Sequence, residues 1–363
     1  MEYIPAENVW EIEPIAWEKA IDNEMSERIY NILLKWLPYA DSQFSDTWNT
    51  RPNCGHFFGG SYWYGQETAH TVVVFAVLSK LGPYQAEVTC ISRDQVKIKA
   101  IKAIRYLAFT HDTGPEDCVR DQGPNPHCSG KKWGGMYDGF FMASQTGRTV
   151  AYLGLAAWLL WDDLDDETKM AVQNVVSWYA DRWSTEPPRN GAFFDTQVEE
   201  NAWTAQGIST AYNMFPEHPH RQTWKDGFIR WSLNTATTFA DRLNQENYEG
   251  KPLNHWINCI TLFPDYTTEN HAFVHPSYLS AGINLRGVHA LFSMISDQQI
   301  LESALYNNEK VYEKALKLFT QYDGLVIPVQ GQDWWYNRQH ERQLTHTILN
   351  VLHHNADAAR LCR

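Results

Sequence analysis

The chain has 363 residues, of which 44% are hydrophobic and 20% charged, so it can bury a large core and is not an intrinsically disordered chain. Its 43 acidic residues outnumber the 30 basic ones, and a net charge of −13 has the wrong sign for a protein that wraps nucleic acid or lies on an anionic membrane. The six cysteines lack the paired spacing of a zinc site, and we expect buried or free thiols.

Helical periodicity recurs along the chain between loops rich in Gly, Pro, Asn and Asp. One alternating segment, residues 325–330, reads as a strand, and Pro328 would restrict it to a sheet edge. The helices are expected at about 21–37, 67–81, 93–110, 143–161, 166–183, 197–213, 221–242, 277–295, 301–321 and 339–360.

Consecutive helical hairpins without a clear linker predict one all-α domain over residues 1–363. We expect an (α/α) toroid of about five to six helical hairpins with little β-structure, and long cleft loops near 111–140 and 244–276. The alternative is two smaller helical domains divided within the Gly/Pro/His-rich stretch 111–135.

The amino-terminal segment begins with acidic residues and has no apolar run of the kind found in signal peptides. No later segment is apolar for long enough to predict a membrane-spanning helix. We therefore expect no membrane partner, and a location that is either cytoplasmic or secreted after removal of a signal peptide.

The acidic motif Asp162–Asp166 has the DDxxD pattern with which helical terpene synthases hold magnesium diphosphate. It lies between two predicted helices, where carboxylates cap the following helix amino terminus. Capping is the expected role, and no metal or organic cofactor is predicted.

Two segments combine polar groups of several kinds with aromatic residues. The first, residues 198–206, carries Asn201 and Trp203 near the start of a helix. The second, residues 265–278, carries Asn270, His271, His275 and Tyr278 and leads into the helix that contains Arg286. Such groups suit β-elimination on a uronic acid, because an amide and a guanidinium stabilise the charge on the carboxylate, while an imidazole and a phenol transfer protons.

The stretch DYTTENHAFVHPSYLSAG resembles the His-to-Tyr segment of the helical-toroid polysaccharide lyases, the superfamily of hyaluronate and chondroitin AC lyases, alginate lyases and heparinases. EENAWTAQG resembles their earlier Asn-Trp segment. The resemblance implies that Asn201 neutralises the substrate carboxylate and that Arg286 is a supporting charge. It also implies that His271 is the base and Tyr278 the acid, or that Tyr278 is both acid and base. Asn270 is the alternative to Asn201 for neutralising the carboxylate, and His275 is the alternative to His271 as the base.

Further aromatic and polar residues are predicted to contact an oligosaccharide or polysaccharide. Flat aromatic rings suit sugar faces, and lysine or arginine would offset the negative charge of the protein toward a polyuronate. Besides Asn270 and His275, these substrate-binding candidates are Trp203, Trp63, Tyr64, Gln66, Lys132, Trp133, Trp334 and Arg338.

The leading functional hypothesis is a polysaccharide lyase that cleaves a uronic-acid-containing glycan by metal-independent β-elimination. The alternative enzyme is a glycoside hydrolase on the same toroid, which needs paired carboxylates. Its candidates are Glu199, Glu200, Asp265 and Glu269. A third possibility is a carbohydrate-binding protein without catalytic activity.

Overall fold

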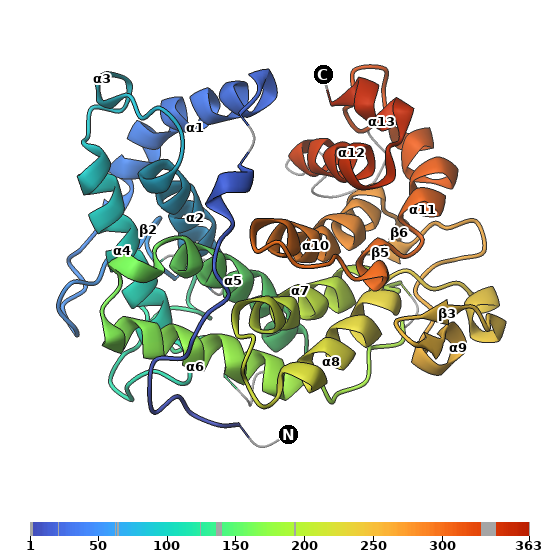
Figure 1. Ribbon diagram of the computed structural model, residues 1–363, viewed down its shortest axis with the longest axis horizontal. Coiled ribbons are helices and arrows are strands. Elements are labelled where there is room, and N and C mark those ends of the chain that lie inside the picture. Colours follow the sequence, from blue (N-terminus) through green and yellow to red (C-terminus); the bar gives the residue numbers. More distant parts are fainter. Residues whose placement is uncertain are drawn as a thin grey trace. The chain divides into compact units, whose positions relative to one another are not determined.

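The computed structural model describes residues 3–20, 22–61, 63, 65–123, 125–135, 140–191, 194–327 and 339–362. Helices dominate these residues (Figure 1), which confirms the all-α prediction. The strands named in the described residues form two-stranded antiparallel ribbons, β1 with β2, β3 with β4 and β5 with β6.

The chain forms two compact units, each discontinuous in sequence. The first unit comprises Met1–Arg182, Thr210–Arg221 and Ile295–Asp297, and the second comprises Trp183–Ser209, Gln222–Met294 and Gln298–Arg363. The stretch 111–135 lies wholly within the first unit and does not divide the two. The single domain expected over 1–363 remains a prediction.

In the first unit, α2 packs against both α4 and α5, and its buried residues are apolar side chains together with Gln66, Thr68 and Thr71. One face of α1 is buried, and Asn23 forms a capping box at the start of that helix. The elements of this unit are α1 (Glu24–Ser42), β1 (Phe44–Ser45), β2 (His56–Phe57), α2 (Gln66–Lys80), α3 (Ala86–Thr89), α4 (Arg93–Thr110), α5 (Phe140–Leu159) and α6 (Asp166–Trp183), whose last residue lies beyond the unit boundary.

In the second unit, residues of α7, α10, α11 and α12 share one hydrophobic core cluster that includes Val198, Ile283, Tyr312 and Leu349. Its elements are α7 (Val198–Met214), α8 (Arg221–Leu233), β3 (Asn247–Tyr248), β4 (Lys251–Pro252), α9 (Leu253–Trp256), β5 (Glu269–Asn270), β6 (Phe273–Val274), α10 (Pro276–Ile295), α11 (Asn308–Lys314), α12 (Gln339–His353) and α13 (Ala356–Leu361). The last turn of α7 from Thr210 onward, the first residue of α8 and the last residue of α10 fall in the first unit.

Three predicted helices are shorter or interrupted in the structure. The helix expected at 221–242 ends at Leu233, where the Asn234 side chain donates to the carbonyls of Arg230 and Trp256. The helix expected at 301–321 breaks at Asn307, which has a positive φ of 56°. The helix expected at 339–360 divides into α12 and α13 at His354, whose φ is 53°. These local conformations override the hydrophobic pattern.

The strand expected at 325–330 is described only to Ile327. Within that part, Val326 forms an isolated antiparallel bridge with Thr320. Pro328 and the two residues after it lie outside the described residues.

The DDxxD motif has the structural role that the sequence predicts. Asp165 Oδ1 accepts a hydrogen bond of 2.8 Å from the backbone N–H of Thr168 in the first turn of α6, and Asp165 also pairs with Arg105. Asp163 pairs with Lys80 and Lys97. Capping and ion pairs therefore account for these carboxylates.

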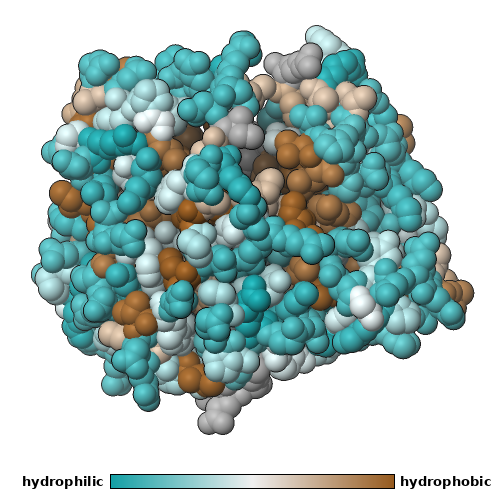
Figure 2. Space-filling view, viewed as in Figure 1, coloured by the Kyte–Doolittle hydropathy of each residue, from teal (hydrophilic) through white to brown (hydrophobic). Residues whose placement is uncertain are grey.

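The visible face of the molecule is mostly hydrophilic, with hydrophobic residues scattered over it (Figure 2). Within the described part of the chain, no helix has the length and apolar character needed to cross a membrane. All six cysteines are free, and four of them are buried, as expected.

Candidate active site

A short β-hairpin in the second unit carries the best-defined acid–base pair. Its strands β5 and β6 pair Asn270 with Phe273, which leaves His271 and Ala272 as a two-residue turn. Both turn residues have positive φ, 52° for His271 and 67° for Ala272. Such turns usually contain Asn-Gly, because L-residues with a Cβ are strained in the left-handed region. The turn therefore holds the backbone of His271 in a conformation that is unfavourable for a residue with a Cβ atom.

The hydroxyl of Tyr278 lies 2.9 Å from Nε2 of His271 and forms a hydrogen bond with it. Tyr278 lies in the first turn of α10 and is only 6% exposed, whereas His271 is exposed. The pair thus joins a buried phenol to an imidazole that solvent reaches, an arrangement suited to proton transfer.

His275, the competing imidazole, is fully buried. Its ring meets the Tyr278 ring edge-on, with centroids 4.4 Å apart and an interplanar angle of 88°. His275 therefore supports the phenol by packing, and His271 is the imidazole that is hydrogen bonded to the hydroxyl.

The segment before α7 pairs with this hairpin. The backbone N–H of Thr196 donates to the carbonyl of Glu269 at 2.9 Å, and the N–H of Ala272 donates to the carbonyl of Phe194 at 3.2 Å. The chain just before residues 198–206 therefore contacts the second segment, and this contact does not include Asn201.

Asp195 lies at this junction, and no motif in the sequence marks it as a site residue. Its Oδ1 accepts from the backbone N–H of Gln197 at 2.8 Å and from Nδ2 of Asn270 at 3.4 Å. Burial raises the pKa of Asp195, while the bonds from Gln197 and the nearby His271 oppose that rise. A carboxyl group thus lies beside Asn270 and close to His271.

Asn201 does not have the position that its predicted role requires. The side chain is fully buried: Oδ1 accepts from the N–H of Arg189 at 3.0 Å, and Nδ2 donates to the carbonyl of Arg189 at 3.1 Å. The same Nδ2 reaches the carbonyl of Asn234 at 3.3 Å. Because its amide is used by the backbone, Asn201 is a structural clamp, and the amide beside the acid–base pair is that of Asn270.

Arg286 is also internal rather than substrate-facing. Its guanidinium is 1% exposed and donates to the carbonyl of Tyr306 at 3.0 Å and to Oδ1 of Asn308 at 2.6 Å. Burial lowers the pKa of Arg286 to about 9. It lies eight residues after Tyr278 on α10, about 12 Å along the helix axis, and is not a supporting charge for the pair.

Trp203 is 5% exposed and packs with Ala202, Ala281 and Leu285 in a small core cluster. It therefore offers little ring surface to a sugar, and its prediction as a substrate platform is wrong. Its contact with α10 explains why an aromatic residue stands at this position.

The remaining described candidates belong to the first unit. Lys132 donates to the carbonyls of His111, Gly114 and Pro115 and so holds its own loop together. Trp133 is 1% exposed and donates to the carbonyl of Leu107. Both have structural roles rather than the predicted binding roles.

Gln66 is buried and donates to the carbonyl of Gln145, whereas the Trp63 side chain is 39% exposed. Trp63 is therefore the described first-unit candidate with a ring available to a ligand. Tyr64, Trp334 and Arg338 lie outside the described residues.

Comparisons with protein-family models, with curated proteins and with solved structures gave no match to this chain.

Proposed function

We propose that this protein is a polysaccharide lyase that cleaves a uronic-acid-containing glycan by metal-independent β-elimination. The observation that carries the proposal is the 2.9 Å hydrogen bond between the buried Tyr278 hydroxyl and the exposed His271 imidazole. The proposal includes the (α/α) toroid as the arrangement of the helical hairpins.

In the proposed reaction, the His271 imidazole takes the proton from C5 of the uronate as the C4–O bond breaks and a C4–C5 double bond forms. Tyr278 donates its hydroxyl proton to the departing glycosidic oxygen. The imidazolium then returns a proton to the phenolate through their hydrogen bond, which restores the pair. Asn270 replaces Asn201 in the proposal as the amide that stabilises the negative charge developing on the uronate carboxylate.

A glycoside hydrolase is the second candidate, because two carboxyl groups of the hairpin region influence each other. Glu269 contributes to raising the pKa of Asp195. A raised pKa is what a general acid requires. The other predicted carboxylates suit that role less: Glu199 and Glu200 are buried, and bonds from Thr267 lower the pKa of Asp265.

The test is incubation with a panel of polyuronates, with measurement of ultraviolet absorbance from the unsaturated product and of new reducing ends. We expect absorbance to rise with at least one polyuronate and Tyr278→Phe to lower the rate by at least a hundredfold, the lower range of general acid–base contributions. Tyr322→Phe is the matched control, since Tyr322 is 89% exposed in the same unit.

Reducing ends without a conjugated product, together with loss of activity in Asp195→Asn or Glu269→Gln, would establish the hydrolase instead. Oligosaccharide binding without turnover of any polyuronate would indicate a carbohydrate-binding protein without catalytic activity. Undiminished elimination by Tyr278→Phe would contradict the assigned acid.

A further inference from the structure

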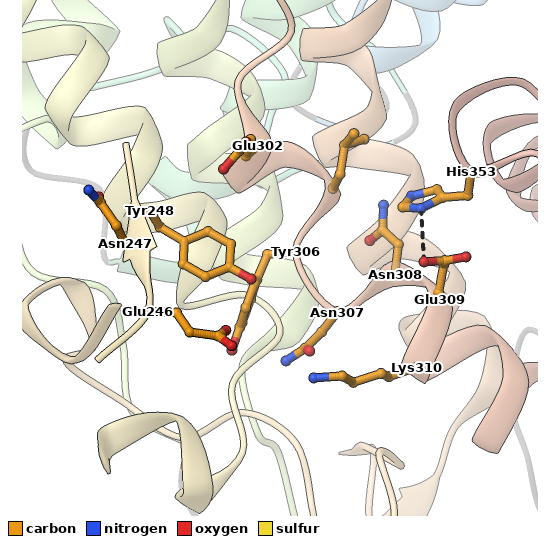
Figure 3. A pocket seen from close by; sticks show the side chains of 11 residues that line it. Glu246, Asn247, Tyr248, Glu302, Tyr306, Asn307, Asn308, Glu309, Lys310 and His353 are labelled. Atoms are coloured by element: carbon orange, nitrogen blue, oxygen red, sulfur yellow. Dashed lines mark ion pairs between the residues drawn. The ribbon is translucent and has the colours of Figure 1, made fainter. Parts of the chain in front are cut away.

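A cavity in the same unit is lined by residues other than His271 and Tyr278. It has a volume of about 520 Å³ and is bounded by the β3 segment, by residues 302–310 and by the end of α12 (Figure 3). Ligand pockets for small organic molecules have volumes of this order. We call it the β3–α11 pocket.

The floor of the β3–α11 pocket is rigidly built. Tyr306 is 4% exposed, and its hydroxyl donates to Oδ1 of the buried Asp241 at 2.5 Å. Asn308 is fully buried, and its Oδ1 accepts from Nη2 of Arg286 at 2.6 Å. The buried side chains of Asp241 and Arg286 thus hold Tyr306 and Asn308 in place at the floor of the cavity. Arg286 therefore has a structural role in this pocket.

The rim of the pocket is rich in hydrogen-bond acceptors. Glu246, Glu302 and Glu309 are exposed there, against the single cationic side chain of Lys310. The Tyr248 and Tyr306 rings lie nearly perpendicular, with centroids 5.2 Å apart. Carboxylates combined with tyrosine rings favour a cation with N–H groups over an anion.

His353 adds an independent feature. Its side chain is 11% exposed, and Nδ1 lies 3.7 Å from Oε2 of Glu309. Burial lowers the pKa of His353, which favours the neutral ring, and the facing carboxylate favours the proton on Nδ1. Nε2, buried and without a hydrogen-bond partner among the described residues, is then an acceptor that lacks a donor.

A metal ion does not explain these features. Within the described residues, no group of three or more His, Cys, Asp or Glu side chains converges closely enough to hold one. Acceptors spread around the mouth of a cavity instead suit an organic molecule whose several N–H groups reach separate partners.

We propose that the β3–α11 pocket binds a small molecule with a primary ammonium group, held by the rim carboxylates and the tyrosine rings. The proposal goes beyond the lyase function and does not depend on it.

The experiment is isothermal titration calorimetry on the full chain with glucosamine, and with N-acetylglucosamine as the matched probe that lacks the ammonium charge. We expect glucosamine to bind at low-millimolar concentration and N-acetylglucosamine at least tenfold more weakly. Glu309→Gln and Glu246→Gln should each weaken glucosamine about tenfold, the effect of losing a charge-assisted hydrogen bond. Glu87→Gln is the control: it removes the same charge at an exposed position of the first unit and should leave the affinity unchanged.

Equal affinities for the two probes, no glucosamine binding, or binding insensitive to both pocket variants would each overturn the proposal. Tyr278→Phe separates the two sites: it should lower the rate of elimination at least a hundredfold and leave glucosamine binding intact. Loss of binding in that variant would contradict an independent pocket.

Discussion

Single residues carry strain at the candidate active site, and Ala272 is the one that allows a clean test. Its φ of 67° is in the region that glycine adopts without penalty. Ala272→Gly should relieve about 1–2 kcal/mol of strain while increasing the entropy of the unfolded chain, for a net stabilisation of about 0.5–1 kcal/mol. Urea unfolding of the full chain measures this difference.

Ala359→Gly is the control for that prediction, because Ala359 lies inside α13, where glycine should destabilise by about 0.5–1 kcal/mol. If both substitutions destabilise equally, the turn is not strained. A stabilised Ala272→Gly variant with lower elimination activity would further link the stiff turn to the placement of His271.

At the scale of elements, Asn234 ends α8 and connects it to the following loop. Besides its two donated bonds, its Oδ1 accepts from the backbone N–H groups of Asn258 at 2.7 Å and Cys259 at 3.0 Å. Asn234→Ala removes a side chain that satisfies buried backbone groups, so we expect about 2–4 kcal/mol of destabilisation. Urea unfolding measures the loss, and the control Asn247→Ala, at an exposed position of β3, should change stability by less than about 0.5 kcal/mol.

The same elements show what the sequence predicts well and what it does not. Long helices follow from apolar periodicity, so α2, α4 and α6 lie within a few residues of their predicted positions. The breaks at Asn307 and His354 do not follow, because a single left-handed residue interrupts a helix without changing the hydrophobic pattern.

In the candidate site too, some placements could be predicted from the sequence and others could not. His271 and Tyr278 lie close in sequence, so their encounter could be anticipated from one hairpin leading into one helix. Asn201 turns inward because its amide bonds to the backbone of Arg189, and Asp195 is placed by pairing of Thr196 with Glu269. These contacts between distant segments leave no periodic signal in the sequence.

At the scale of the whole molecule, each unit contains a fully buried neutral imidazole. Burial lowers the pKa of His111 in the first unit and of His289 in the second unit to about 3. In the unfolded chain, histidine titrates near 6.5, so between these values the unfolded state binds more protons than the folded state. Stability should therefore be complete above pH 6.5 and fall as the pH decreases toward 3, by about 1.4 kcal/mol per pH unit for each histidine.

Urea unfolding at several values between about pH 7.5 and 4.5 measures this loss, since most carboxylates titrate below that range. His111→Asn and His289→Asn should each reduce the pH dependence by about one proton, even where they lower stability at pH 7. His255→Asn, the same substitution at an exposed position of the second unit, is the control. Unfolding midpoints that stay constant from pH 7.5 to 4.5, or slopes that the buried-histidine variants share with the parent, would mean that these imidazoles are protonated within the fold.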